Sequence, residues 1–197
     1  MFKYCNSQST QKAWNHAKKK TKRYQEQDQA KVEEYLKAIE NIPAEKIAYV
    51  DETGIDSCLY REYGRSKRGK KLYSKISGRK YRRTSIVAAQ IAKRTIAPLQ
   101  YSGTMNGNLF ENWFESMLLP ALPEGSVIVM DNASFHKKSR LIRIAQNKGF
   151  KLIFLPPYSP ELNPIENFWS WLKRRLRKIL PLFDSFDDAL DSCFQVE

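Results

Sequence analysis

Cysteine is scarce in this sequence, and long apolar runs are absent from it. The three cysteines, Cys5, Cys58 and Cys193, lie far apart without C-x-x-C spacing, which argues against a disulfide framework and the usual zinc motifs. No apolar run approaches the roughly eighteen residues of a membrane span, and the N-terminus lacks the apolar core of a signal peptide. We therefore expect a cytoplasmic protein with reduced cysteines and no membrane partner.

Internal repeats and long Ser- or Gly-rich linkers are also missing. A length of 197 residues suits one domain with an additional tail, and it is enough to build a proper core. We divide the chain into a basic N-terminal arm with a connector helix, residues 1–44, and one folded domain, residues 45–197.

Negative charge is in short supply. The chain has 34 Lys and Arg against 21 Asp and Glu, which gives a formal net charge of +13 and a pI of about 9.6. Such an excess indicates a polyanionic partner. Residues 1–24 alone hold seven Lys or Arg and no acid. This arm either binds phosphates or remains solvated and disordered, which is the commoner fate of such a run.

A second basic segment, residues 61–83, has eleven Lys or Arg against one Glu, with tyrosines between them. Its glycines at 64, 69 and 78 favour hairpin turns over helix. A basic hairpin suits phosphate contact and base stacking on DNA, whereas a soluble strand edge guarded by cations is the alternative. The residues predicted to bind DNA, three of them on a later helix, are Arg61, Arg65, Lys67, Arg68, Lys70, Lys71, Arg79, Lys80, Arg82, Arg83, Lys173, Arg174 and Arg175.

Hydrophobic patterns predict a mixed sheet. The runs at 46–50, 84–92 and 96–101 predict three successive antiparallel strands, with a turn at 93–95. Strands at 126–130 and 151–155 flank a helix expected over 137–148, which makes a right-handed βαβ crossover with parallel strands. Further helices are expected over 26–42, 106–119, 164–180 and from 186, the last being either a closing helix or a partner surface.

Glu166 lies at the start of the basic helix expected over 164–180. Four prolines stiffen the preceding loop, because each fixes its backbone φ angle near −65°. Asn163 suits the N-cap, and Pro164 suits the first helical position. Glu166 would then be the third residue of the helix. One interpretation is that Glu166 only caps this helix and complements its dipole.

Asp51 and Asp131 each follow a predicted strand. If these strands are neighbours, their separation of about 4.8 Å brings Asp51, Asp131 and Glu166 within reach of one another. Three carboxylates so close repel unless cations neutralise them, and carboxylate oxygens are ligands that Mg²⁺ and Mn²⁺ prefer. Two such ions activate a water or a 3′-hydroxyl for in-line displacement at phosphorus. Taken singly, Asp51 can be a turn residue and Asp131 a helix cap.

Three runs of sequence resemble a known family. YVDETGID at 49–56, VIVMDNASFHK at 127–137 and LPPYSPELNPIENFW at 155–169 closely resemble the catalytic domain of mariner-superfamily DDE transposases, in particular the bacterial insertion-sequence branch. The 34 residues between Asp131 and Glu166 match the spacing of that branch. The resemblance covers about residues 45–190.

The resemblance implies a ribonuclease-H-like α/β fold: a mixed sheet of three antiparallel strands followed by parallel strands, with flanking helices. Residues 45–197 would be the DDE catalytic domain with its C-terminal helices. Asp51, Asp131 and Glu166 would bind two Mg²⁺ or Mn²⁺ ions and cleave double-stranded DNA at insertion-sequence ends. They would then join the freed 3′-ends to target DNA, often at a TA dinucleotide.

The resemblance also implies supporting roles and partners. Glu52 would be structural beside the acids, Asn132 would hold the Asp131 loop, and His136 would orient a phosphate or an acid, or be a structural histidine. A homodimer is expected in the synaptic complex. The reaction needs no covalent enzyme intermediate, which agrees with the lack of a Ser, Cys or Tyr nucleophile with a paired base.

The chain departs from the family pattern at two points. Arg65 stands where relatives usually carry Trp. About 45 residues precede the first strand, which is too few for the paired helix-turn-helix modules that recognise transposon ends, so a separate helix-turn-helix polypeptide is an expected partner. Two alternatives stay open: a catalytically idle DNA-binding remnant, and a hydrolytic nuclease of the same fold. The expected location is the bacterial nucleoid.

Overall fold

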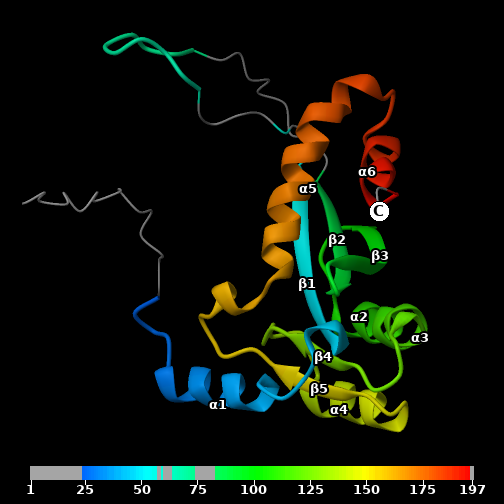
Figure 1. The fold of residues 1–197 in the computed structure, drawn as a ribbon. Helices are drawn as coiled ribbons and strands as arrows, with labels where there is room; N and C mark the ends of the chain where they lie inside the picture. Colours follow the sequence, from blue (N-terminus) through cyan, green and yellow to red (C-terminus); the bar gives the residue numbers. More distant parts are fainter. Residues whose placement is uncertain (1–23, 57–58, 60–63, 74–82, 196–197) are drawn as a thin grey trace, which may run out of the picture.

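A five-stranded mixed sheet in the order β3-β2-β1-β4-β5 forms the centre of the molecule (Figure 1). The computed structural model describes residues 24–56, 59, 64–73 and 83–195. The sheet has three antiparallel strands followed by two parallel ones, as the sequence predicts. In the described part of the chain, every helix is too short or too polar to span a bilayer.

The antiparallel half consists of β1 (Ile47–Asp56), β2 (Arg83–Ile91) and β3 (Arg94–Ser102). β1 pairs with β2 along nearly its whole length, from Ala48 opposite Ile91 to Asp56 opposite Arg83. β2 and β3 are joined at Ala92 and Lys93, which both have positive φ angles, as a two-residue hairpin turn requires. The turn therefore begins one residue earlier, and is one residue shorter, than the sequence predicts.

The parallel half consists of β4 (Val127–Met130), α4 (Lys138–Asn147) and β5 (Lys151–Phe154). β4 is parallel to both β1 and β5, so the predicted βαβ unit is confirmed. Gly149 follows α4 with a φ angle of 80°, the left-handed conformation that glycine adopts without strain after a helix end.

One face of the sheet packs against α2 (Gly107–Trp113), a π-helical turn (Phe114–Leu118), α3 (Leu119–Ala121) and α4. Asn106 caps α2 by accepting a hydrogen bond from the Leu109 N–H, 2.9 Å away. The core on this face is aromatic. Its largest members are Phe110, Trp113 and Phe114, each at most 1% exposed.

The opposite face packs against α1 (Gln29–Ile39), α5 (Ile165–Ile179) and α6 (Phe186–Phe194). α5 runs beside β1 (Figure 1) and buries Ile165, Trp169, Leu172 and Leu176, which recur at three- and four-residue spacing. α6 covers the same core through Ala189, Leu190 and Cys193, so it is a closing helix. Cys5 and Cys58 lie outside the described residues.

Two local predictions near the acids are wrong. Asp51 and the three residues after it lie inside β1 rather than at a strand end. The pairing of β1 with β4 stops at Tyr49, but its pairing with β2 continues for seven more residues, to Asp56. Asn163 does not cap α5 through its side chain. Pro164 occupies the cap position, and the Asn163 side chain is buried in the preceding loop, so Glu166 becomes the second helical residue.

Candidate active site

Asp51, Asp131 and Glu166 line one cleft of about 320 Å³. The parallel pairing between β1 and β4 ends at Tyr49 on β1, which lies opposite Val129 on β4. Asp51 lies two residues after Tyr49, and Asp131 lies two residues after Val129. Equal offsets on neighbouring parallel strands place two side chains beside each other. Glu166 enters from the first turn of α5, and the loop from Leu155 to Pro160 forms the remaining wall.

Trp169 holds Asp51 from the far side of the cleft. Its indole Nε1–H donates a hydrogen bond to Asp51 Oδ2 at 3.1 Å. Burial, helped by the nearby charges of Glu166 and Asp131 and opposed by two hydrogen bonds, raises the pKa of Asp51 to about 7. A buried carboxylate with acidic neighbours is short of positive charge, so this position favours a cation.

Asp131 is fixed by two donors. The Ala133 backbone N–H lies 3.1 Å from Asp131 Oδ1, and His136 Nε2 lies 3.3 Å from the same atom. The hydrogen bond from His136 lowers the pKa of Asp131, which is therefore ionised at neutral pH. The His136 side chain is only 3% exposed whereas that of Asp131 is 54% exposed, so the carboxylate faces the open cleft.

Asn132 ties together the ends of the two parallel strands. Its amide nitrogen donates to the Leu155 carbonyl just after β5, and its oxygen accepts from Lys138 Nζ. Asn132 is one of the residues that line the cleft, but both hydrogen-bonding ends of its side chain are engaged by other protein groups. Asn132 holds the Asp131 loop in place and is not available as a ligand.

The isosteric change Asn132→Asp is expected to lower the free energy of unfolding by about 1–3 kcal/mol, because it sets a carboxylate oxygen against the Leu155 carbonyl. Urea denaturation at pH 7 measures this. The matched control is Asn106→Asp, where Asp caps α2 as well as Asn does, so stability should be unchanged or higher. Equal stability of the two variants would contradict the assigned Asn132 contact.

Glu52 faces away from the acid cleft. Neighbouring residues of a strand point to opposite faces, so Asp51 points toward α5 while Glu52 points toward β3. There Glu52 Oε2 accepts a hydrogen bond from the Tyr101 hydroxyl at 2.8 Å, and burial raises the pKa of Glu52. Glu52 and His136 both line a second, smaller cavity of about 130 Å³ behind the cleft.

Two contacts of the acids were not anticipated from the sequence. Trp169 reads as part of the apolar face of α5, although its position one turn after Glu166 is a signal that it lies near the site. Tyr101 reads only as a strand residue. No local pattern indicates its partner, because the Glu52 contact depends on the register of β1, β2 and β3.

The cleft suits hydrated divalent ions. Its acidic donors are carboxylates on three different elements, and Asp51 lacks compensating positive charge. Within the described residues no group of three or more His, Cys, Asp or Glu side chains is arranged to hold a metal ion, so the three acids line the cleft without forming a closed site. Mg²⁺ takes one or two carboxylates and keeps several waters or phosphate oxygens, so an open arrangement of this kind fits it better than a closed cage would.

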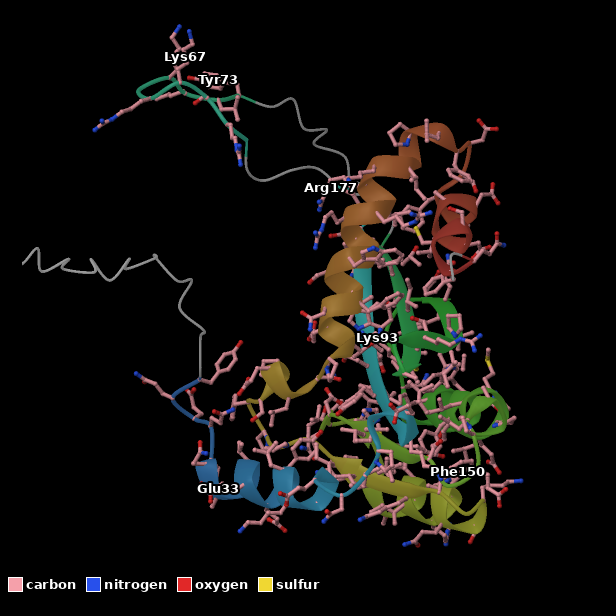
Figure 2. All side chains as sticks on the ribbon, viewed as in Figure 1. Glu33, Lys67, Tyr73, Lys93, Phe150 and Arg177 are labelled. Atoms are coloured by element: carbon pink, nitrogen blue, oxygen red, sulfur yellow. The ribbon has the colours of Figure 1, made fainter. Side chains whose placement is uncertain are left out.

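The predicted DNA-binding residues fall into three groups. Arg65, Lys67, Arg68, Lys70 and Lys71 are all exposed in residues 64–73, which turn at Arg68 and Gly69, and Figure 2 shows Lys67 and Tyr73 far from the sheet. Arg83, at the start of β2, is also exposed. Arg61, Arg79, Lys80 and Arg82 lie outside the described residues.

On α5, Arg174 is exposed and Lys173 is half-buried. Arg175 packs with its guanidinium 5.7 Å from the centre of the Trp171 ring. It also lies close to the Cys193 thiol: burial raises the pKa of this thiol, and the charge and hydrogen bond of Arg175 offset part of that rise. The guanidinium of Arg175 is therefore partly engaged by groups of the protein itself. Arg174 is the best placed of the three to contact an external phosphate.

The fold and the cleft define a class. A mixed five-stranded sheet in the order β3-β2-β1-β4-β5, with three acids lining one cleft, is the ribonuclease-H-like arrangement. The family model described as DDE superfamily endonuclease matches residues 46–189, and the chain belongs to this family. The resemblance to mariner-superfamily DDE transposases is thereby confirmed.

Individual relatives match parts of the chain. The protein y4pE/y4sA of Sinorhizobium fredii is 37% identical over 73 residues, 34% of this chain and 47% of the relative. Transposable element Tc1 transposase of Caenorhabditis elegans is 35% identical over 69 residues, 35% of this chain and 25% of the relative. The matched parts thus span between a quarter and about half of these relatives.

Solved structures share the fold. The Mos1 transposase paired-end complex with left transposon end has a TM-score of 0.63 at 15% identity, covering 93% of this chain and 60% of that one. The Mos1 strand transfer complex has a TM-score of 0.61 at 16% identity, with the same coverage. The predicted ribonuclease-H-like fold is confirmed.

Proposed function

We propose that this chain is the catalytic part of a transposase, which cleaves DNA at insertion-sequence ends and joins the freed 3′-ends to target DNA. The observation that carries the proposal is the meeting of Asp51, Asp131 and Glu166 in one cleft of a protein with a net charge of +13. Family membership and the transposase names of several relatives support it.

Asp51, Asp131 and Glu166 would hold two Mg²⁺ or Mn²⁺ ions. Such ions activate the attacking water or 3′-hydroxyl and stabilise the leaving oxygen of an in-line displacement at phosphorus. The protein supplies the arrangement. Trp169 and His136 each hold one aspartate, and the stiff proline loop before α5 holds Glu166 at the cleft edge. Two solved Mos1 complexes are described as containing Mn and Mg, which agrees with this choice of ion.

The DNA would lie across the basic surface. Five exposed cations within residues 64–73 offer phosphate contacts on a segment separate from the acids, and Arg174 offers another on α5, the helix that carries Glu166. Binding through phosphates is independent of sequence and weakens steeply with salt. These residues would position the strand, while recognition of particular ends would depend on other modules.

The assembly would be larger than this chain. The solved relatives are described as paired-end and strand transfer complexes, and this chain spans 60% of the Mos1 chain in them. We infer a homodimer that holds two DNA ends together, and a helix-turn-helix polypeptide that recognises them. The family match begins at residue 46, which supports a division into an N-terminal arm, residues 1–44, and a catalytic domain, residues 45–197.

Pre-cleaved DNA ends with free 3′-hydroxyls test this function. Incubated with Mg²⁺ and a supercoiled target, the chain is expected to give joined product, which gel electrophoresis detects as a slower, covalently linked band. A matched substrate ending in a 3′-dideoxynucleotide should give none, because it lacks the nucleophile. Nicking without joining would identify a hydrolytic nuclease. Binding without either reaction would identify an idle remnant.

A further inference from the structure

The small cavity behind the cleft contains groups that the proposed reaction does not use. It measures about 130 Å³ and is lined by Glu52 and His136 together with Asp51 and Asp131. Phe110 and Phe135 form its apolar wall together with Val50, Met130 and Ala133. Both rings lie 4.2 Å from the His136 ring, centroid to centroid, so the imidazole is held in one plane.

A count of hydrogen bonds leaves two polar atoms in this region without a partner. Glu52 Oε2 accepts from Tyr101, but Glu52 Oε1 is buried with no partner among the described residues. His136 Nε2 contacts Asp131, but His136 Nδ1 is likewise buried and unpaired among them. A buried polar atom without a partner is costly, and nearly all such atoms in native proteins bond to protein or ordered water.

One water satisfies both atoms. With the His136 proton placed on Nε2, where it points to Asp131, Nδ1 can accept a hydrogen bond, and Glu52 Oε1 can accept one as well. A water has two protons to donate. The cavity of about 130 Å³ exceeds the roughly 30 Å³ that one water occupies in the liquid, and polar groups line it.

We propose that an ordered water in this cavity donates to Glu52 Oε1 and to His136 Nδ1, and completes a chain from Tyr101 through Glu52 and His136 to Asp131. The chain fixes the orientation of the Asp131 carboxylate toward its divalent ion. Tyr101, Glu52 and His136 are therefore positioning residues. This inference rests on the proposed function, because the ion is the one that the cleft would bind.

Two variants of His136 test the roles of its two ring nitrogens separately. In His136→Gln the amide nitrogen replaces Nε2 and still reaches Asp131, whereas in His136→Asn the amide replaces Nδ1 and loses Asp131. Partners behind a metal ligand typically change affinity by about 10–100-fold. With DNA-free protein and Mn²⁺ titrated by electron paramagnetic resonance, we expect His136→Asn to bind at least about tenfold more weakly than the wild type. His136→Gln keeps the Asp131 contact but loses the Nδ1 acceptor of the water, so its loss should be smaller, about three- to tenfold.

Tyr101→Phe tests the distal end of the chain by removing one oxygen atom. We expect it to weaken Mn²⁺ binding by about three- to tenfold, since Glu52 then loses its direct donor. Tyr35→Phe is the matched control, because Tyr35 is a buried tyrosine on α1 outside the cavity, and its Mn²⁺ affinity should equal that of the wild type. The double variant Tyr101→Phe/His136→Asn should bind Mn²⁺ no more weakly than His136→Asn alone, because His136→Asn has already broken the chain of hydrogen bonds.

These Mn²⁺ titrations distinguish a failure of the hydrogen-bond chain from a failure of the proposed function. If the wild-type chain binds no Mn²⁺, the proposed function fails. If it binds Mn²⁺ but His136→Asn and His136→Gln lose the same amount, or Tyr101→Phe loses nothing, the chain of hydrogen bonds is overturned while the function stands. Should His136→Asn fail to fold, Tyr101→Phe decides the question.

Discussion

Replacing Asp131 with Asn is expected to lower metal-dependent DNA cleavage by at least about a thousandfold, since the Lewis-acid contribution of a bound ion is worth several kcal/mol. Asn preserves the shape of the side chain and can still accept from the Ala133 N–H, so the loop should keep its structure. What it loses is the negative charge that faces the open cleft.

The DNA affinity of Asp131→Asn should not fall with its cleavage activity. Removing one carboxylate from a basic surface leaves phosphate binding equal or tighter, and a gel-shift titration at fixed salt measures it. Asp56→Asn is the control, because Asp56 is an exposed acid at the far end of β1, outside the cleft, and its loss should leave cleavage intact. Cleavage by Asp131→Asn at wild-type rates would show that Asp131 does not hold the ion.

The second large effect concerns stability. Asp51→Asn is expected to raise the free energy of unfolding of the metal-free protein at pH 8 by up to about 4 kcal/mol, because one pKa unit corresponds to about 1.4 kcal/mol. The pKa of Asp51 rises from 3.8 to about 7 in the fold, mainly through burial. The fold therefore favours the protonated acid, and wild-type stability falls as the pH rises from about 4 to 7.

Urea denaturation between pH 4 and pH 8 measures this. The Asn side chain still accepts from Trp169 Nε1 and does not titrate, so the advantage of Asp51→Asn should grow over that window and be small at pH 4. Saturating Mg²⁺ should narrow the difference at pH 8, because the ion stabilises only the ionised wild-type cleft. A variant no more stable than the wild type at pH 8 would contradict the burial of the Asp51 charge.

Local patterns were sufficient for most of the fold. The apolar run at 126–130, the helix with its glycine end and the following apolar run predicted β4, α4 and β5, because each signal lies within a few residues of the element that it defines. The parallel pairing followed from the βαβ connection. The three motifs then predicted the ribonuclease-H-like fold.

The errors arose where distant pairing decides local structure. Asp51 lies inside β1 because β2, which begins at residue 83, extends that strand, and nothing within residues 47–56 reveals the extension. The contacts of Asp51 with Trp169 and of Glu52 with Tyr101 likewise join residues 118 and 49 positions apart. Sequence indicated which acids would meet in one cleft, while tertiary structure decides what holds them.

The most direct test of the account is to locate the metal. A crystal of the protein soaked with Mn²⁺ and measured near the manganese absorption edge gives an anomalous difference map in which each bound ion appears as a peak. Our account predicts peaks in the cleft between Asp51, Asp131 and Glu166, which disappear in Asp131→Asn. A map with no peak in that cleft, or with manganese held only by other side chains, would contradict it.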